Sequence, residues 1–188
     1  MITILPKDNI NVSWPNLPVF FLAGPVQGGS DWQHTMCQLL HQETAKPGAR
    51  IQEFFVAIPC RYPAGHPLRE YQSEGSAKEG VFARQLDWER HYLRIAAERG
   101  KIIFWLPCES RTEPRKDGNP YARDTYGELG EWRGRLIHEP KYRKRVLIGA
   151  EEGFPGLDVI QRNFRQAFLY DFPFYLTMEE VVEKAMLR

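Results

Sequence analysis

The sequence predicts an α/β protein with a doubly wound parallel sheet of five strands between two layers of helices. Short apolar runs alternate along the chain with longer stretches whose apolar residues recur at helical spacing. Parallel strands need helical crossovers, and strands that are buried on both faces read as continuous apolar runs. The alternation therefore favours a three-layer α/β/α arrangement, for which we expect the strand order 2-1-3-4-5.

The predicted strands are short and the helices between them are of ordinary length. Strands are expected at residues 19–24, 54–59, 101–107, 145–149 and 173–176. Helices are expected at residues 31–44, 81–98, 125–136 and 156–168, with a long polar loop at residues 61–80. A last helix opens at residues 177–180 (TMEE), which fit a capping box.

Length and composition favour one compact domain, residues 1–188, in the cytoplasm. Lys and Arg number 25 against 24 Asp and Glu, so the formal charge of +1 gives no reason to expect nucleic acid or an anionic membrane as a partner. The apolar runs are too short to span a bilayer, and the N-terminal residues lack the features of a secretory signal. Three cysteines without paired spacing favour a reducing compartment over a disulfide framework.

Ligands of doubly wound sheets bind beyond the carboxyl ends of the strands, where the strand order reverses. This rule selects the loops that follow Ala23, Pro59, Pro107 and Gly149. In the first loop, residues 24–32, glycines permit close approach of the backbone, and the next helix offers free N–H groups to an anion or a sugar hydroxyl. The same loop is equally compatible with a tight strand–helix turn that binds nothing.

Residues 124–132 (DTYGELGEW) carry the stronger signal, because a helix is expected to begin there after the loop that leaves the third strand. Thr125 and Glu128 fit the capping-box pattern Thr-x-x-Glu, in which Glu128 only folds back onto its own helix end. Alternatively, Glu128 faces the crevice. In that case the helix dipole lowers its pKa and keeps the carboxylate ionised for nucleophilic attack.

Several segments follow one another in a recognisable order: residues 21–25 (FLAGP), Trp32, residues 87–89 (DWE), residues 103–107 (IFWLP) and residues 125–130 (TYGELG). Together they resemble the nucleoside 2-deoxyribosyltransferase superfamily, and most of all its deoxyribosyltransferase-like branch. The resemblance covers roughly residues 19–156. It implies a flavodoxin-like fold, a homo-oligomer, and cleavage of an N-glycosidic bond by a glutamate nucleophile, for which Glu128 occupies the matching position.

The resemblance also suggests roles for other residues. An acidic residue on the helix before the third strand handles the base, and either Asp87 or Glu89 matches it. Asp124 is the nearest candidate for a further carboxylate in front of the nucleophile, although its spacing differs from that of better-known members. The expected substrate-binding residues are Gly24, Pro25, Trp32, Trp88, Glu89, Pro107 and Thr125.

This chemistry agrees with the residue types. An oxocarbenium-like sugar needs a carboxylate beneath C1′, and the departing base needs a proton donor. The sequence thus predicts an enzyme, without metal or cofactor, that cleaves or transfers at the N-glycosidic bond of a (deoxy)nucleoside or nucleotide. The alternatives are a nucleoside 5′-monophosphate N-glycosidase and a non-catalytic nucleotide-binding or sensing domain.

Charged and metal-binding residue types say less about the function. Arginines and lysines of residues 111–123, together with Arg61, either bind a phosphate or are simply solvated. The five histidines show neither an H-E-x-x-H motif nor a zinc spacing with cysteine, so the sequence predicts no metal site.

Overall fold

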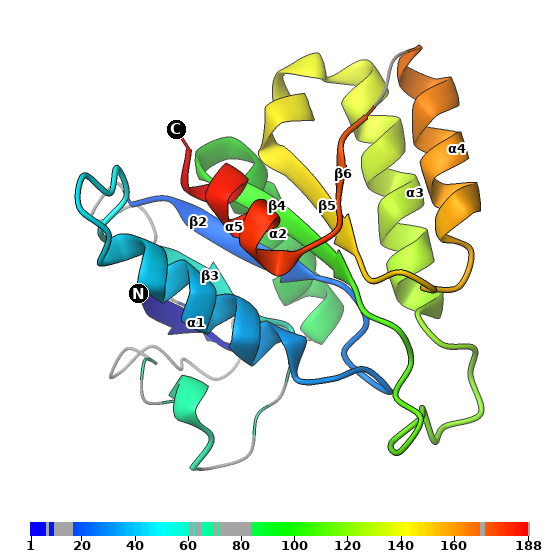
Figure 1. Ribbon diagram of the computed structural model, residues 1–188, viewed down its shortest axis with the longest axis horizontal. Coiled ribbons are helices and arrows are strands. Elements are labelled where there is room, and N and C mark those ends of the chain that lie inside the picture. The colour runs from blue at the N-terminus through cyan, green and yellow to red at the C-terminus, as the bar shows by residue number, and fades with distance from the viewer. Residues whose placement is uncertain are drawn as a thin grey trace.

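The structure is a computed structural model that describes residues 1–6, 8–9, 17–60, 62, 65–69, 71, 84–169 and 172–187. Within these residues, six parallel strands form one sheet with helices on both faces (Figure 1). The strands are β1 (Ile2–Ile4), β2 (Val19–Ala23), β3 (Phe55–Ala57), β4 (Lys101–Leu106), β5 (Val146–Ala150) and β6 (Phe174–Tyr175). Their order in the sheet is β1-β3-β2-β4-β5-β6. The predicted α/β class with a parallel sheet is confirmed.

The edge strand β1 corrects the prediction of five strands to six. Ile2 pairs with Phe55 and Ile4 with Ala57, so β1 extends the sheet beyond β3. The strand is only three residues long, and the buried Thr3 interrupts its apolar run. Thr3 is accommodated because its hydroxyl donates a hydrogen bond to the carbonyl of Leu68 at 2.9 Å. A strand so short leaves too little pattern in the sequence to be recognised.

Five α-helices accompany the strands in the described residues: α1 (Trp32–Thr44), α2 (Gln85–Arg99), α3 (Arg123–His138), α4 (Leu157–Phe168) and α5 (Met178–Met186). Short 3-10 helices lie at Pro67–Arg69 and Pro140–Arg145. Most of the loop predicted at residues 61–80, and the predicted helix start at residues 81–83, lie outside the described residues. None of the described helices is long and apolar enough to cross a membrane.

The capping box predicted at the start of α5 is confirmed. The Thr177 hydroxyl accepts a hydrogen bond from the Glu180 amide at 3.2 Å, and the Glu180 carboxylate accepts one from the Thr177 amide at 3.3 Å. The two bonds satisfy amide groups that the first helical turn leaves without an intrahelical partner.

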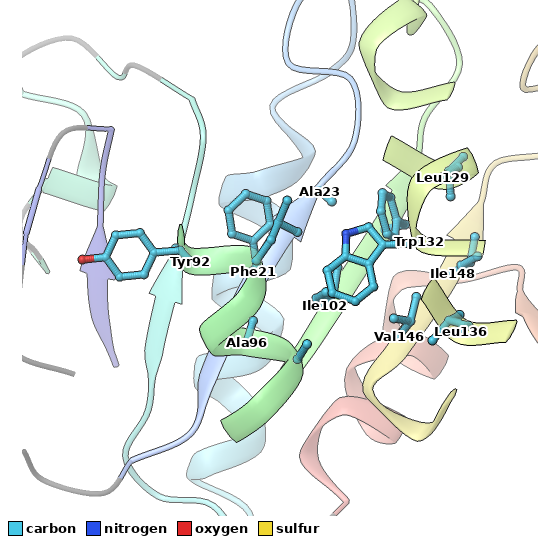
Figure 2. Packing of buried hydrophobic residues seen from close by; sticks show 14 of the residues in the cluster. Phe21, Ala23, Tyr92, Ala96, Ile102, Leu129, Trp132, Leu136, Val146 and Ile148 are labelled. Carbon is cyan, nitrogen blue, oxygen red and sulfur yellow. The ribbon is translucent and has the colours of Figure 1, made fainter. Parts of the chain in front are cut away.

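Side chains of the central strands alternate between two apolar cores, one on each face of the sheet. Phe21 and Ala23 of β2 point into the core that α2, α3 and α4 cover. Figure 2 shows part of this core, with Tyr92 and Ala96 from α2. Phe20 and Leu22 point into the opposite core, beneath α1 and α5, which lie on the near face in Figure 1. Burial on both faces explains why the strands read as continuous apolar runs.

The topology creates a crevice at one end of β2. This strand is hydrogen-bonded to β3 on one side and to β4 on the other. The chain leaves β2 through α1, which packs on one face, and leaves β4 through α3, which packs on the opposite face. The strand order therefore reverses at β2, and its carboxyl end is the position at which ligands of such sheets bind.

Candidate functional site

A cleft of about 940 Å³ lies at the carboxyl end of β2, between the facing sides of α2 and α3. Apolar side chains of Phe21, Ala23, Leu93 and Ala122 form part of its lining. Its polar lining includes Gln85, Glu89, Arg90, Asp124, Thr125, Glu128 and Glu131. Small-molecule sites commonly occupy roughly 300–1,000 Å³ and combine an apolar lining with a few polar groups, and this cleft has both properties.

Gly24 brings the backbone of the first loop against the neighbouring strand. Its φ of 147° lies in the region that favours glycine, and a Cβ there would lie 2.2 Å from the Trp105 carbonyl oxygen. No larger side chain fits, because the obstructing atom belongs to the backbone of β4. On the other side of β4, Gly149 leaves room for the Trp105 ring, which a Cβ would approach to 2.6 Å.

The first loop is also fixed to the charged loop between β4 and α3. The Ser110 amide donates a hydrogen bond to the Gly28 carbonyl at 2.6 Å. Arg115 lines the cleft, but its guanidinium is held by both carboxylate oxygens of Asp117, at 2.6 and 2.8 Å. Because this bidentate pair occupies the guanidinium, Arg115 is poorly placed to bind a phosphate.

Helix α3 begins at Arg123, two residues before the predicted start. The preceding residue, Ala122, has a positive φ of 57°, and no side chain caps the helix. Thr125 therefore lies inside the first turn, and the capping box predicted for Thr125 and Glu128 does not form. The interpretation of Glu128 as a capping residue is wrong, which leaves its position in the cleft to be explained.

Glu128 is half-buried in the cleft, and no residue in the described part of the chain makes a hydrogen bond or ion pair with it. Burial, with the carboxylates of Glu89, Asp124 and Glu131, raises its pKa from the usual 4.5 to about 8. The expectation that the helix dipole lowers this pKa is wrong. The dipole acts mainly within the first turn, whereas Glu128 lies beyond it and loses solvation there.

The three neighbouring carboxylates differ from Glu128 because each has a partner. Glu89 accepts a hydrogen bond from Gln85 Nε2 at 2.8 Å, and the same nitrogen donates to the Pro59 carbonyl. Asp124 pairs with Arg123 at 3.3 Å, and Glu131 pairs with Arg135 at 2.8 Å. The cluster thus contains one unpaired carboxyl group among paired ones.

The structure brings together six of the predicted site residues. Gly24, Pro25, Glu89, Asp124, Thr125 and Glu128 all line the cleft. Asp87 does not line it, because it lies on another side of α2, where it pairs with Arg84 at 3.5 Å. Pro107 also lies outside the lining, and its carbonyl accepts a hydrogen bond from the Tyr121 hydroxyl at 2.8 Å.

Neither predicted tryptophan lines the cleft. Trp32 is 1% exposed, and its indole nitrogen donates to the Pro25 carbonyl at 2.8 Å. Trp88 is 0% exposed, and its nitrogen donates to the Asp8 carbonyl at 3.0 Å. Both rings belong to the apolar cores and have no free face for stacking on a base, contrary to the prediction.

Gln85, Arg90 and Cys60 also line the cleft, although none of them is among the site residues expected from the sequence. Gln85 lies one helical turn before Glu89, so the helical spacing of α2 could have indicated it once Glu89 was chosen. Cys60 lies three residues after the end of β3, in the loop that the position rule for strand ends selects. Burial and the Asp31 carboxylate raise the pKa of Cys60 to about 11, so its thiol is not ionised at neutral pH.

No model of a protein family, no curated protein and no solved structure matches this chain. The resemblance to the deoxyribosyltransferase superfamily therefore depends on the ordered sequence segments alone.

Proposed function

We propose that the cleft binds a nucleoside or nucleotide and cleaves its N-glycosidic bond, with the Glu128 carboxylate as the nucleophile. The observation that carries this proposal is the environment of Glu128. Its carboxyl group is half-buried, unpaired among the described residues, and surrounded by Glu89, Asp124 and Glu131. The sequence segments that resemble the deoxyribosyltransferase superfamily support the same reaction.

The electrostatics of the cleft suit this reaction. Cleavage of an N-glycosidic bond builds positive charge on C1′ and the ring oxygen of the sugar. The carboxylates that raise the pKa of Glu128 disfavour a further negative charge at this position. The same field favours a positive charge there, and it is oriented before the substrate binds.

The reaction proceeds in two steps. A Glu128 oxygen forms a bond to C1′ while the bond between C1′ and the base nitrogen breaks, and the electron pair leaves with the base. A pKa of about 8 means that Glu128 carries a proton in most molecules at pH 7. As the sugar becomes cationic, the ionised form of Glu128 is favoured, and the proton passes to the departing base. Water or a second base then attacks C1′ and releases Glu128.

Glu89 and Gln85 are the residues best placed to orient the base. They lie one turn apart on α2, face the cleft, and are hydrogen-bonded to each other at 2.8 Å. Both N–H groups of Gln85 are donated to Glu89 and to the Pro59 carbonyl, so the pair presents oxygen acceptors to N–H groups on the edge of a base. Asp124, at the first turn of α3, is more exposed and contributes charge to the cluster.

The test is release of free base from a panel of ribonucleosides, 2′-deoxynucleosides and their 5′-monophosphates, followed by chromatography. Glu128→Gln is expected to lose several orders of magnitude in turnover, because a neutral amide cannot trap the sugar cation. The matched control is Glu131→Gln, one turn away on α3, which should keep measurable turnover. A 2-fluoro sugar substrate should leave a glycosyl adduct on the peptide that carries Glu128. Full activity of Glu128→Gln excludes the nucleophile.

A non-catalytic binding domain is the second candidate, and one observation favours it. Because its raised pKa keeps Glu128 mostly protonated at neutral pH, the carboxyl group in this second candidate donates a hydrogen bond to the ligand and does not attack C1′. Calorimetric titration of the same panel distinguishes the two functions. Binding of a nucleotide without release of base, at pH 7 and at pH 9, would establish the binding domain.

A further inference from the structure

Three side chains, two from the start of α1 and one from the loop after β3, meet beside the first turn of this helix. Asp31 precedes the helix, His34 lies within its first turn, and His66 comes from the loop after β3. Asp31 Oδ2 is 3.1 Å from His66 Nε2 and 3.7 Å from His34 Nδ1. One ligand atom from each residue can be chosen so that all three lie within 4.8 Å of one another.

These separations approach those of a tetrahedral metal site. With metal–ligand distances of about 2.0–2.1 Å, the donor atoms around zinc lie roughly 3.3 Å apart. Both contacts of Asp31 Oδ2 are within a few tenths of an ångström of this value. The two histidine rings have centroids 5.2 Å apart at an interplanar angle of 71°, and a ring nitrogen of each lies within 4.8 Å of the other.

Asp31 is turned toward this cluster instead of toward its own helix. It occupies the N-cap position of α1, where aspartate commonly accepts a bond from a helix amide, yet it makes no such bond. Its Oδ1 accepts a hydrogen bond from the Tyr62 hydroxyl at 2.8 Å, which leaves Oδ2 directed at the two histidines. Carboxylates that bind metals are held by outer hydrogen bonds of this kind.

Tyr62 also holds His66 in place. Its ring stacks on the His66 ring, with centroids 3.9 Å apart and planes 19° from parallel. The Tyr62 carbonyl in turn accepts a hydrogen bond from Arg69 Nε at 2.8 Å. A single buried side chain thus orients both the carboxylate and one imidazole.

Gln33 provides a second, independent indication of a ligand. Its side chain is 3% exposed, and its Nε2 makes no hydrogen bond in the described part of the chain. Its Oε1 lies 3.5 Å from the Tyr62 hydroxyl, so the amide is adjacent to the cluster. If the amide is rotated by a half-turn, Nε2 lies 3.5 Å from the Tyr62 hydroxyl and Oε1 takes the place of the atom without a partner. A buried donor without a partner destabilises the folded state, and an oxygen-bearing ligand beside the cluster would satisfy it.

We propose that Asp31, His34 and His66 bind one divalent transition-metal ion, with Zn²⁺ as the best match to two imidazoles and one carboxylate. Three protein ligands leave at least one coordination position for water or an oxygen of a bound molecule. The adjacent Gln33 Nε2 would donate a hydrogen bond to that oxygen. Asp31 and the two histidines are all partly exposed, so the ion can enter from solvent.

Metal binding requires one proton to move. The Leu68 amide donates to His66 Nδ1 at 3.3 Å, so in the free protein the neutral ring carries its proton on Nε2. When Nε2 binds the metal, the proton moves to Nδ1 and this long hydrogen bond is lost. The imidazole stays neutral, so no oxidant, reductant or further reactant is needed.

The metal site is separate from the cleft but shares its loops. Residues Gly24 to Gln27 of the first loop line the cleft, and the same loop continues to Asp31. Cys60 lines the cleft from the other loop, two residues before Tyr62. The proposal does not depend on the reaction assigned to Glu128.

The test uses the full chain, freed of metal with a chelator and titrated calorimetrically with ZnCl₂. We expect one Zn²⁺ per chain at micromolar concentration or tighter, and no comparable binding of Mg²⁺, which disfavours imidazole. Asp31→Asn, His34→Gln and His66→Gln should each weaken binding at least tenfold, and Tyr62→Phe by about tenfold. Asp31→Asn keeps an oxygen that can accept the Tyr62 hydrogen bond, so the loss of Zn²⁺ affinity in this variant measures the contribution of the negative charge.

The matched control is His138→Gln, at the exposed end of α3, which should bind Zn²⁺ like the wild type. Co²⁺ should give weak visible bands without the intense sulfur-to-cobalt band that cysteine ligands produce. Variants are compared only where the melting temperature without metal is unchanged, and any one of the three ligand variants suffices. Absent binding, equal binding in a folded ligand variant, or a sulfur-to-cobalt band would each overturn the proposal.

Discussion

The Glu128→Gln variant should be more stable than the wild type, by an amount that depends on pH. The folded protein holds the Glu128 proton up to a pKa of about 8, whereas an exposed glutamate in the unfolded chain loses it near 4.5. Between these values the folded state binds more protons than the unfolded state, so the contribution of Glu128 to stability falls as pH rises. Below pH 4.5 the side chain is protonated in both states and contributes no difference.

The magnitude follows from the two pKa values. At about 1.4 kcal/mol per pH unit, the interval from 4.5 to about 8 corresponds to a ceiling of roughly 5 kcal/mol. Glu128 is only half-buried, and solvent screening reduces this figure, so we expect about 2–3 kcal/mol. Glutamine has the same shape and no charge, so the variant should gain that amount at pH 8.5 and nothing at pH 4.5.

The assay is urea denaturation of both proteins at several pH values between 4.5 and 9, with circular dichroism as the signal. The matched control is Glu183→Gln, an exposed position on α5, which should differ from the wild type by the same small amount at every pH. A Glu128→Gln variant that is less stable than the wild type at pH 8.5, or whose difference does not change with pH, would refute the assigned burial and charge environment.

Three further substitutions test other parts of the structure by the same denaturation assay. Trp88→Phe should cost about 1–3 kcal/mol, through a lost hydrogen bond to the Asp8 carbonyl and a small cavity, and should leave ligand affinity unchanged; a weaker affinity without loss of stability would return Trp88 to the site. Gly24→Ala should cost at least about 3 kcal/mol or prevent folding, because the added Cβ meets the Trp105 carbonyl; a neutral effect would contradict the close approach of β2 and β4. Leu169→Gly should gain about 0.5–1 kcal/mol, because Leu169 is 94% exposed and ends α4 with a positive φ of 55°; a loss of stability would show that this conformation is incorrectly assigned.

The sequence pattern Thr-x-x-Glu illustrates what local reasoning can predict. It occurs at residues 177–180 and at residues 125–128, and it forms a capping box only at the first. At the start of α3, contacts distant in sequence accompany an earlier helix start. The Tyr121 hydroxyl binds the Pro107 carbonyl, the Tyr126 hydroxyl binds the Pro155 carbonyl, and the helix starts two residues early. Neither contact is visible in four residues of sequence.

The sequence likewise predicts the position of the candidate site but not its electrostatics. The position rule for parallel sheets selected the loop at Gly24 and the helix that carries Glu128, and both line the cleft, because strand ends can be read from apolar runs. The raised pKa of Glu128 was not predictable, since it depends on burial and on Glu89, which belongs to another helix. Asp31 and His66 are also far apart in sequence, and only the fold shows their contact.

The two glycines beside Trp105 bear on how this protein can change over evolutionary time. Gly24 and Gly149 belong to the segments on either side of β4, and each accepts part of Trp105 where a methyl group would not fit. Substitution at either position would displace the sheet beneath the cleft. The side chains of Gln85 and Arg90, by contrast, project from α2 into the cleft. Selection for a new ligand can therefore act on the helices, and directed evolution of specificity should begin there with both glycines kept.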